Sequence, residues 1–289
     1  MFNALNVRHA LAGAALALSM PAALAQLTWS ASAPDAATLQ PVVDAFRAHI
    51  GTLNPNNPGS LGAGRREINW DGAPDTVSAA NAFPGGFFNR TNAPLARGTV
   101  FCTPGTGFQL SSRDSSGVAV EYGNINPTYP AEFAVFSPQR LFTAIDSNVC
   151  DVEFRVPGTD EEATVPAFGA LFTDVDLAGV TSMEFFDLHG QSLGKYDVVP
   201  GPTSAESLSF LAIAFNEPVI RRVRITSGNS PLGPDEDLPE VDVVVMDDFI
   251  FGEPIAIEAP CAGDLDGDGL VGLTDLAFFL SALYGTSCF

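Results

Sequence analysis

Hydrophobic and polar residues alternate along much of this chain, in short runs separated by clusters of Gly, Pro and Asp. A period of two places every second side chain on one face of a β-strand. In residues 150–156, Cys150, Val152 and Phe154 share one predicted face, with charged residues on the other. Residues 207–215 are apolar at nearly every position. That run predicts a central strand that is buried on both faces or lies under a helix.

From residue 98 onward, strand-like segments follow one another without a helical pattern between them. The segments are 98–103, 107–111, 117–122, 140–145, 150–156, 167–174, 180–187, 193–199, 207–215, 218–226 and 241–251. About ten strands without intervening helices predict a mainly β fold, an antiparallel sandwich of the jelly-roll type.

A short helix is predicted before this β-rich body. Residues 41–50 place Val43 and Phe46 on one face, with Pro41 in the first turn and Gly51 as the stop signal. The remaining residues up to 97 are rich in Asn, Pro and Gly and show no clear period. The predicted divisions are a leader at 1–25, a helical and loop-rich lead packing on the body at 26–97, a β-sandwich at 98–256 and a tail at 257–289.

The first 25 residues resemble a cleaved export signal. An apolar run at 11–20 is followed by Ala23-Leu-Ala25 before Gln26, the small-x-small pattern that signal peptidase recognises. The run is too short to cross about 30 Å of hydrocarbon. We therefore expect a secreted protein, extracellular or at the cell surface, with no transmembrane segment in the mature chain.

Charge narrows the range of partners. The formal net charge is −21, yet only 16% of residues are charged and 46% are hydrophobic, so the chain has enough apolar material for a core. Lys195 is the single lysine among 13 basic residues. Nucleic acid is excluded, because binding to phosphates needs a Lys/Arg surface. Divalent cations are favoured instead.

Export also gives the four cysteines a meaning, because secreted proteins form disulfides. Cys102 and Cys150 lie in the body, whereas Cys261 and Cys288 bracket a short segment at the end. Pairing by proximity in the sequence predicts Cys102–Cys150 and Cys261–Cys288, one of three connectivities.

The strongest motif is a calcium loop at 264–275, DLDGDGLVGLTD. Calcium takes six to eight oxygen ligands, which alternate residues of a tight loop can direct at one centre. Position 6 of the loop is glycine, as the sharp turn requires. The predicted ligands are Asp264, Asp266 and Asp268 at positions 1, 3 and 5, the carbonyl of Leu270 at position 7, and Asp275 at position 12.

This loop, with Asp at position 12 and one helix after it at 273–284, resembles a dockerin repeat. The resemblance implies Ca²⁺ binding and a cohesin-like partner for 261–289, on scaffolds that assemble polysaccharide-degrading enzymes. Dockerins normally carry two repeats, and this sequence contains one. Single cysteine-flanked units of this kind also resemble surface-attachment segments of secreted bacterial proteins, so a cell-surface partner is an alternative.

The body resembles a group of uncharacterised secreted bacterial proteins. The resemblance rests on the segments 65–72, 168–176, 183–187, 222–228 and 245–254, and it implies a β-sandwich without implying an activity. The last segment, with Asp247-Asp248-Phe, is also similar to the final strand of carbohydrate-binding jelly rolls, where an acidic residue often helps to hold calcium. Because neighbouring residues of a strand face opposite ways, at most one of the two could bind a second metal.

Enzyme motifs are missing from the sequence. It has no Gly-x-Ser-x-Gly, no His-Glu-x-x-His and no phosphate-binding glycine loop. Trp70, Tyr122 and Tyr129 are the best candidates for an aromatic platform that stacks on a sugar ring. We expect a secreted, calcium-binding, non-catalytic β-sandwich protein whose tail serves surface attachment or complex assembly. The alternative is a polysaccharide-binding module or glycoside hydrolase docked through the tail.

Overall fold

The computed structural model describes residues 26–233, 240–257, 263, 265 and 271–284. The predicted leader, half of the predicted calcium loop, Cys261 and Cys288 lie outside these residues. The described chain is mainly β, with antiparallel sheets, as the sequence predicts. The jelly-roll topology remains a prediction.

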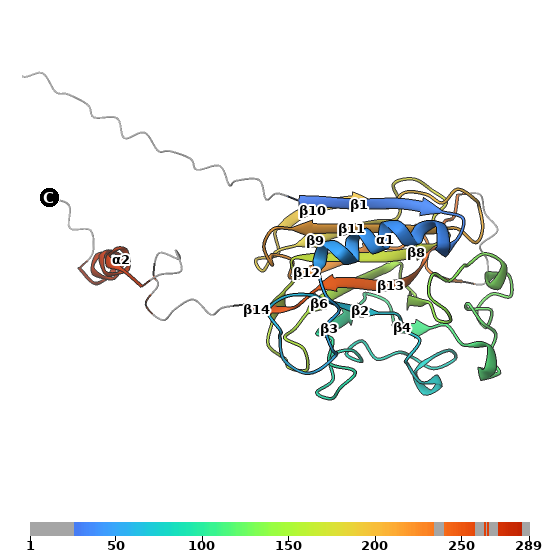
Figure 1. The fold of residues 1–289 in the computed structure, drawn as a ribbon, viewed down its shortest axis with the longest axis horizontal. Coiled ribbons are helices and arrows are strands. Elements are labelled where there is room, and N and C mark those ends of the chain that lie inside the picture. Colours follow the sequence, from blue (N-terminus) through green and yellow to red (C-terminus); the bar gives the residue numbers. More distant parts are fainter. Residues whose placement is uncertain (1–25, 234–239, 258–262, 264, 266–270, 285–289) are drawn as a thin grey trace, which may run out of the picture.

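Two main sheets and one covering helix make up most of the body (Figure 1). Within the described residues, the large sheet has seven strands in the order β1-β11-β8-β13-β5-β4, with β2 also paired to β13. Their bounds are β1 Gln26–Ala33, β2 Arg65–Ile68, β4 Gly107–Leu110, β5 Phe142–Ile145, β8 Ala167–Thr173, β11 Leu208–Phe215 and β13 Val245–Gly252. Residues 26–97, predicted as a helical and loop-rich lead, thus also supply β1 and β2 to this sheet.

The second sheet has five strands in the order β10-β9-β12-β6-β3. Their bounds are β3 Thr99–Cys102, β6 Val149–Phe154, β9 Ser182–Phe186, β10 Ser192–Asp197 and β12 Arg222–Thr226. A third, two-stranded antiparallel sheet pairs β7 Ala163–Thr164 with β14 Ile255–Ala256. Single 3-10 turns occur at Asp75–Val77, Asp114–Ser116 and Tyr129–Ala131.

The main hydrophobic core lies between the two sheets. It joins Phe172 and Phe249 of the large sheet to Phe154, Phe185 and Ile225 of the smaller one. Strand β6 alternates between buried and part-exposed residues along its whole length, which confirms the predicted inward face.

Helix α1, Ala36–Ile50, covers the outer face of the large sheet. Val43 and Phe46 pack there against β11, and all eight residues of β11 are buried, as predicted for this segment. The helix begins earlier than predicted because the Asp35 side chain accepts the Thr38 N–H at 2.8 Å and caps it. Pro41 therefore lies inside the helix.

The strand predicted at 117–122 is wrong. Ser112 donates its hydroxyl to the carbonyls of Val118 and Ala119, and Glu121 and Tyr122 have positive φ angles of 46° and 62°. This segment is therefore a turn, because positive φ is incompatible with an extended strand.

The predicted Cys102–Cys150 disulfide is also wrong. Cys102 of β3 stands opposite Asp151 of β6, so Cys150, the neighbour of Asp151, faces the other side of the sheet. Cys102 is exposed, Cys150 is buried, and both are free thiols. The two cysteines do lie on adjacent strands, but their separation in the sequence does not determine which face of the sheet each side chain occupies.

Candidate functional site

The candidate site lies on the outer face of the large sheet, beside α1, where β13 carries a bulge. The pairing register of β13 with β8 shifts between Met246 and Phe249, and Asp247 and Asp248 both lie in this shifted stretch. A bulge interrupts the alternation of side chains and redirects them, and bulges are frequent beside functional sites.

The bulge brings both aspartates to one loop. Ser137 donates its hydroxyl to Asp248 Oδ1 at 2.6 Å, and the same hydroxyl lies 3.4 Å from Asp247 Oδ1. The N–H groups of Phe136 and Ser137 donate to Asp247 Oδ2 at 2.6 and 3.2 Å. The expectation that the two side chains face opposite ways is therefore wrong, because it assumed a regular strand.

The pair is buried, with exposed fractions of 0% for Asp247 and 3% for Asp248. Burial and then the charge of Asp248 raise the pKa of Asp247 well above its usual range, and burial also raises the pKa of Asp248. Asp247 is fully buried beneath the 136–137 loop, and the pair supplies two carboxylates where calcium takes six to eight oxygen ligands. Across the described part of the chain, no group of three or more His, Cys, Asp or Glu could hold a metal. These contacts favour a loop anchor at the pair over the predicted second metal site.

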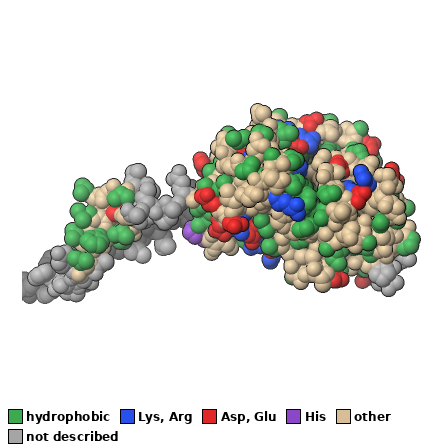
Figure 2. All heavy atoms as spheres, turned by 90° about the horizontal axis from the view of Figure 1, so that it is seen from below, with side chains coloured by type: hydrophobic (Ala, Val, Ile, Leu, Met, Phe, Trp, Pro, Cys, Tyr) green, Lys and Arg blue, Asp and Glu red, His purple; other side chains and the backbone are tan. Residues whose placement is uncertain are grey.

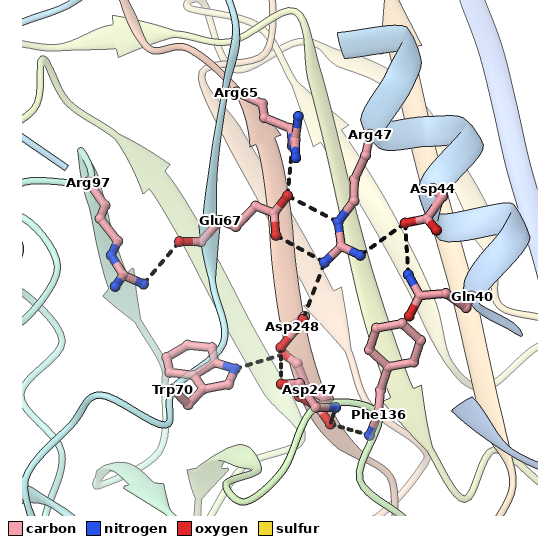
Figure 3. Close-up of polar contacts among 11 residues, drawn as sticks. Gln40, Asp44, Arg47, Arg65, Glu67, Trp70, Arg97, Phe136, Asp247 and Asp248 are labelled. Carbon is pink, nitrogen blue, oxygen red and sulfur yellow. Dashed lines mark hydrogen bonds and ion pairs between the residues drawn. The ribbon is translucent and has the colours of Figure 1, made fainter. Parts of the chain in front are cut away.

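Glu67 of β2 is held by two arginines (Figure 3). Arg47 of α1 donates Nε and Nη2 to the two Glu67 carboxylate oxygens at 3.0 and 2.9 Å, and Arg65 Nε donates at 2.7 Å. Arg47 Nη2 also lies 3.7 Å from Asp248 Oδ2. Burial alone would lower the pKa of Arg47, but the hydrogen bonds and charge of Glu67 raise it. This ion-pair network joins α1, β2 and β13.

A cleft of about 440 Å³ is bounded by this network. Residues from α1, from the segment 53–69 and from the 136–138 loop line it, together with Arg97 and Asp248, and most of them are polar. Arg97 donates Nη1 to the Glu67 carbonyl oxygen at 2.9 Å, and its guanidinium lies 4.5 Å from the centre of the Phe88 ring. Burial, and next the charge of Arg66, lower the pKa of Arg97 to about 10, so it remains charged at neutral pH.

The cleft offers groups for binding more than groups for catalysis. Both carboxylate oxygens of Glu67 already accept hydrogen bonds from arginines, and Asp247 is covered by the 136–137 loop. In contrast, two buried polar atoms around the cleft, Arg97 Nε and Asn56 Oδ1, have no hydrogen-bond partner among the described residues.

The predicted aromatic platform is wrong. Trp70, Tyr122 and Tyr129 have exposed fractions of 0%, 0% and 1%. Trp70 stacks on Phe142 with ring centres 4.2 Å apart and donates Nε1 to the Asp247 carbonyl at 2.7 Å. Tyr122 donates its hydroxyl to the Leu141 carbonyl at 2.7 Å. These rings fill hydrophobic clusters, so no ring of the three faces a ligand.

The segment 65–72 builds much of the site, although its charges gave no strand signal. Arg65 and Glu67 belong to the network, and Arg66 forms a fully buried ion pair with Glu253 at 2.7 Å. Asp71 accepts the N–H groups of Gln139 and Arg140 and so holds the neighbouring loop. Arg47, Glu67 and Arg97 were missed by sequence reasoning, because they meet only through the pairing of distant strands.

The tail contains helix α2, Leu273–Tyr284, with Asp275 in its first turn. Asp275 is only 3% exposed, and its carboxylate accepts the N–H groups of Leu265 at 2.7 Å and Gly272 at 2.6 Å. Apolar side chains of the same helix face outward, as Figure 2 shows, and Leu273 is 85% exposed. Asp275 therefore points back toward Leu265 and Gly272, as the position-12 ligand of a calcium loop points toward its own loop. Asp264, Asp266, Asp268 and Leu270 lie outside the described residues.

Comparison with family models, with curated proteins and with solved structures finds no match for this chain. Of the helices described, none has both the length and the apolar character needed to cross a membrane.

Proposed function

We propose that this is a secreted, calcium-dependent binding protein that uses its tail for attachment. The β-sandwich body carries the cleft beside α1, and the dockerin-like unit at 261–289 joins the body to a cohesin-like partner or to the cell surface. Export rests on the leader pattern at 1–25, and attachment rests on the resemblance of the tail.

The observation that carries the proposal is the orientation of Asp275. Carboxylates are usually exposed and leucines usually buried, but in α2 the Asp275 carboxylate is buried and the leucines face outward. Such a reversal is stable where a cation compensates the crowded carboxylates. The spacing of Asp264, Asp266 and Asp268 before Asp275 supplies the remaining acidic ligands of one Ca²⁺ site.

Calcium titration of the mature protein tests this proposal. Isothermal titration should show one Ca²⁺ site in the wild type, weakened about a hundredfold or more in Asp264→Ala and in Asp275→Ala. Helical circular dichroism should fall when a chelator removes calcium from the wild type, because metal binding and ordering of α2 are coupled. Asp248→Ala is the matched control in the body, and it should keep the calcium affinity. A site that survives both tail substitutions and disappears in Asp248→Ala would contradict the assignment.

A polysaccharide-binding role for the body is the second candidate, and the unpaired polar atoms around the cleft favour it. A hydrolase would need two carboxyl groups facing the same bond, about 5 to 10 Å apart. Glu67 and Asp247 are occupied by other contacts, so we propose binding without catalysis. Release of reducing sugars from a panel of polysaccharides would overturn this choice.

A further inference from the structure

Arg97 is the charged group in the cleft that lacks a carboxylate partner. Arg47 and Arg65 pair with Glu67, and Arg66 pairs with Glu253. No ion pair involves Arg97 in the described part of the chain, although the sequence has 34 acidic against 13 basic residues. The charges of Asp248 and Glu67 act on Arg97 without forming an ion pair, so its guanidinium can still pair with a carboxylate from outside.

Arg97 also has unused hydrogen-bonding capacity. A guanidinium has five N–H donors, and the contact found for Arg97 is Nη1 to the Glu67 carbonyl at 2.9 Å. Its Nε is buried without a partner. The Phe88 ring, 4.5 Å away, fixes the plane of the group. Nε and Nη2 form the edge with which Arg47 binds the Glu67 carboxylate, so the same edge of Arg97 matches a second carboxylate.

The rest of the cleft suits hydroxyl groups. Gln40, Asn56 and Asn69 bring amide side chains to its wall, and Asn56 Oδ1 is a buried acceptor without a partner. An acceptor of this kind needs a donor such as a ligand hydroxyl. A volume of about 440 Å³ lies within the range of small-ligand pockets.

We propose that the cleft beside α1 binds a carboxylate-bearing sugar, a uronic acid unit, with Arg97 as the cation that receives the carboxylate. This inference rests on the binding role proposed for the body and names its ligand class. A single carboxylate matches the Arg97 guanidinium, which forms no ion pair of its own within the described residues although the charges of Asp248 and Glu67 act on it. A phosphate dianion would bring excess negative charge close to Asp248 and Glu67, which also line the cleft.

Binding to defined sugars tests the proposal on the mature, calcium-loaded protein. The probes are sodium galacturonate, a galacturonate trimer, the neutral galactose trimer and inorganic phosphate, each measured by isothermal titration. We expect the galacturonate trimer to bind and the neutral trimer to bind at least tenfold more weakly. Comparable binding of monomer and trimer would assign the site to a free sugar acid, and preference for the trimer would assign it to a polysaccharide.

Substitutions then assign the anchor. Arg97→Gln should weaken binding of the trimer about 10- to 100-fold, and Arg97→Lys should restore part of the loss, because it keeps the charge. Arg90→Gln is the matched control, since Arg90 also stacks on a phenyl ring, that of Phe87 at 4.6 Å, and does not line the cleft. Should Arg97→Gln fail to fold, protection of wild-type Arg97 from phenylglyoxal by the trimer, read by peptide mass spectrometry, replaces it.

The outcomes separate this inference from the proposed function. Equal binding of neutral and acidic trimers, tighter binding of phosphate, or full affinity in Arg97→Gln would overturn the uronic acid assignment and leave a binding body. Failure of every sugar to bind would overturn the binding role of the cleft as well. Neither result alters the calcium titration at Asp264, which tests the tail alone.

Discussion

Arg66 shows at the level of one residue how this protein satisfies a buried charge. Its side chain is 0% exposed and donates to both carboxylate oxygens of Glu253, at 2.8 and 2.7 Å. It also donates to the carbonyls of Asn57, Gly59 and Ala96. The pair thereby fastens the irregular segment after α1 to the end of β13.

We predict that Arg66→Met destabilises the protein by about 3–5 kcal/mol, because it leaves the Glu253 carboxylate buried without its partner. Denaturant unfolding measures the loss. Arg224→Gln removes an ion pair whose arginine is 45% exposed, and it should cost less than about 1 kcal/mol. Equal losses in the two variants would show that burial of the charge is not the cause.

The two described cysteines should differ in reactivity. Cys102 is exposed, although burial of part of the group and the nearby Glu153 raise the pKa of its thiol. Cys150 is buried, and burial raises its pKa well above the usual range. We expect a maleimide to label Cys102 slowly in the native protein and Cys150 only after unfolding. Peptide mass spectrometry identifies the sites, and a native disulfide-linked peptide joining the two would contradict the register of β3 and β6.

At the scale of elements, α1 packs closely on β8 because Gly169 of β8 has no side chain. A Cβ atom on Gly169 would lie 2.6 Å from the Ala212 Cβ and 3.0 Å from the Phe46 ring. We predict that Gly169→Ala lowers stability by about 1–3 kcal/mol through overpacking. Gly86→Ala is the control, because a Cβ there meets no atom within 4 Å. Thermal unfolding compares the two, and an unchanged melting temperature in Gly169→Ala would show that the helix can shift.

Elements with strong patterns were predictable from sequence, and those defined by a distant partner were not. The alternation of 150–156 and the apolar run of 207–215 gave β6 and β11 with their burial. Strand β2 was missed because its sequence, RREI, is mostly charged and its partner β13 lies at the other end of the body. The candidate cleft was missed for the same reason. Its charged side chains come together only when β2, β13 and α1 pack against one another. The bulge at Asp247 cannot be predicted from a pattern of regular alternation.

At the scale of the whole molecule, several carboxyl groups hold protons more tightly when the protein is folded. Burial and then Asp176 raise the pKa of Asp174 to about 8, burial and then Glu206 raise that of Glu121 to about 7, and burial raises that of Asp71 to about 6. A folded-state pKa above the unfolded value contributes stability at low pH that is lost as the pH rises through the folded value.

We therefore predict a higher melting temperature at pH 5.5 than at pH 8.5, at constant calcium and ionic strength. The difference should shrink in Asp174→Asn, which cannot titrate, and persist in Asp160→Asn, a substitution at an exposed loop position. Differential scanning calorimetry provides the measurement. A melting temperature that falls between pH 8.5 and 5.5 would show that other groups dominate the pH dependence.

The pairing of β1 with β11 has a consequence for when the protein folds. The first described strand pairs along its whole length with residues 208–215, and β2 pairs with β13 still later in the chain. Contacts between residues so distant in sequence form slowly, because the entropic cost of closing a long loop comes before the contacts stabilise the fold. The large sheet can therefore be completed only after β13, which ends at Gly252, has been synthesised. A chain that stays unfolded until its last strand has emerged is suited to threading through an export channel, so this strand order is compatible with the export that we propose above.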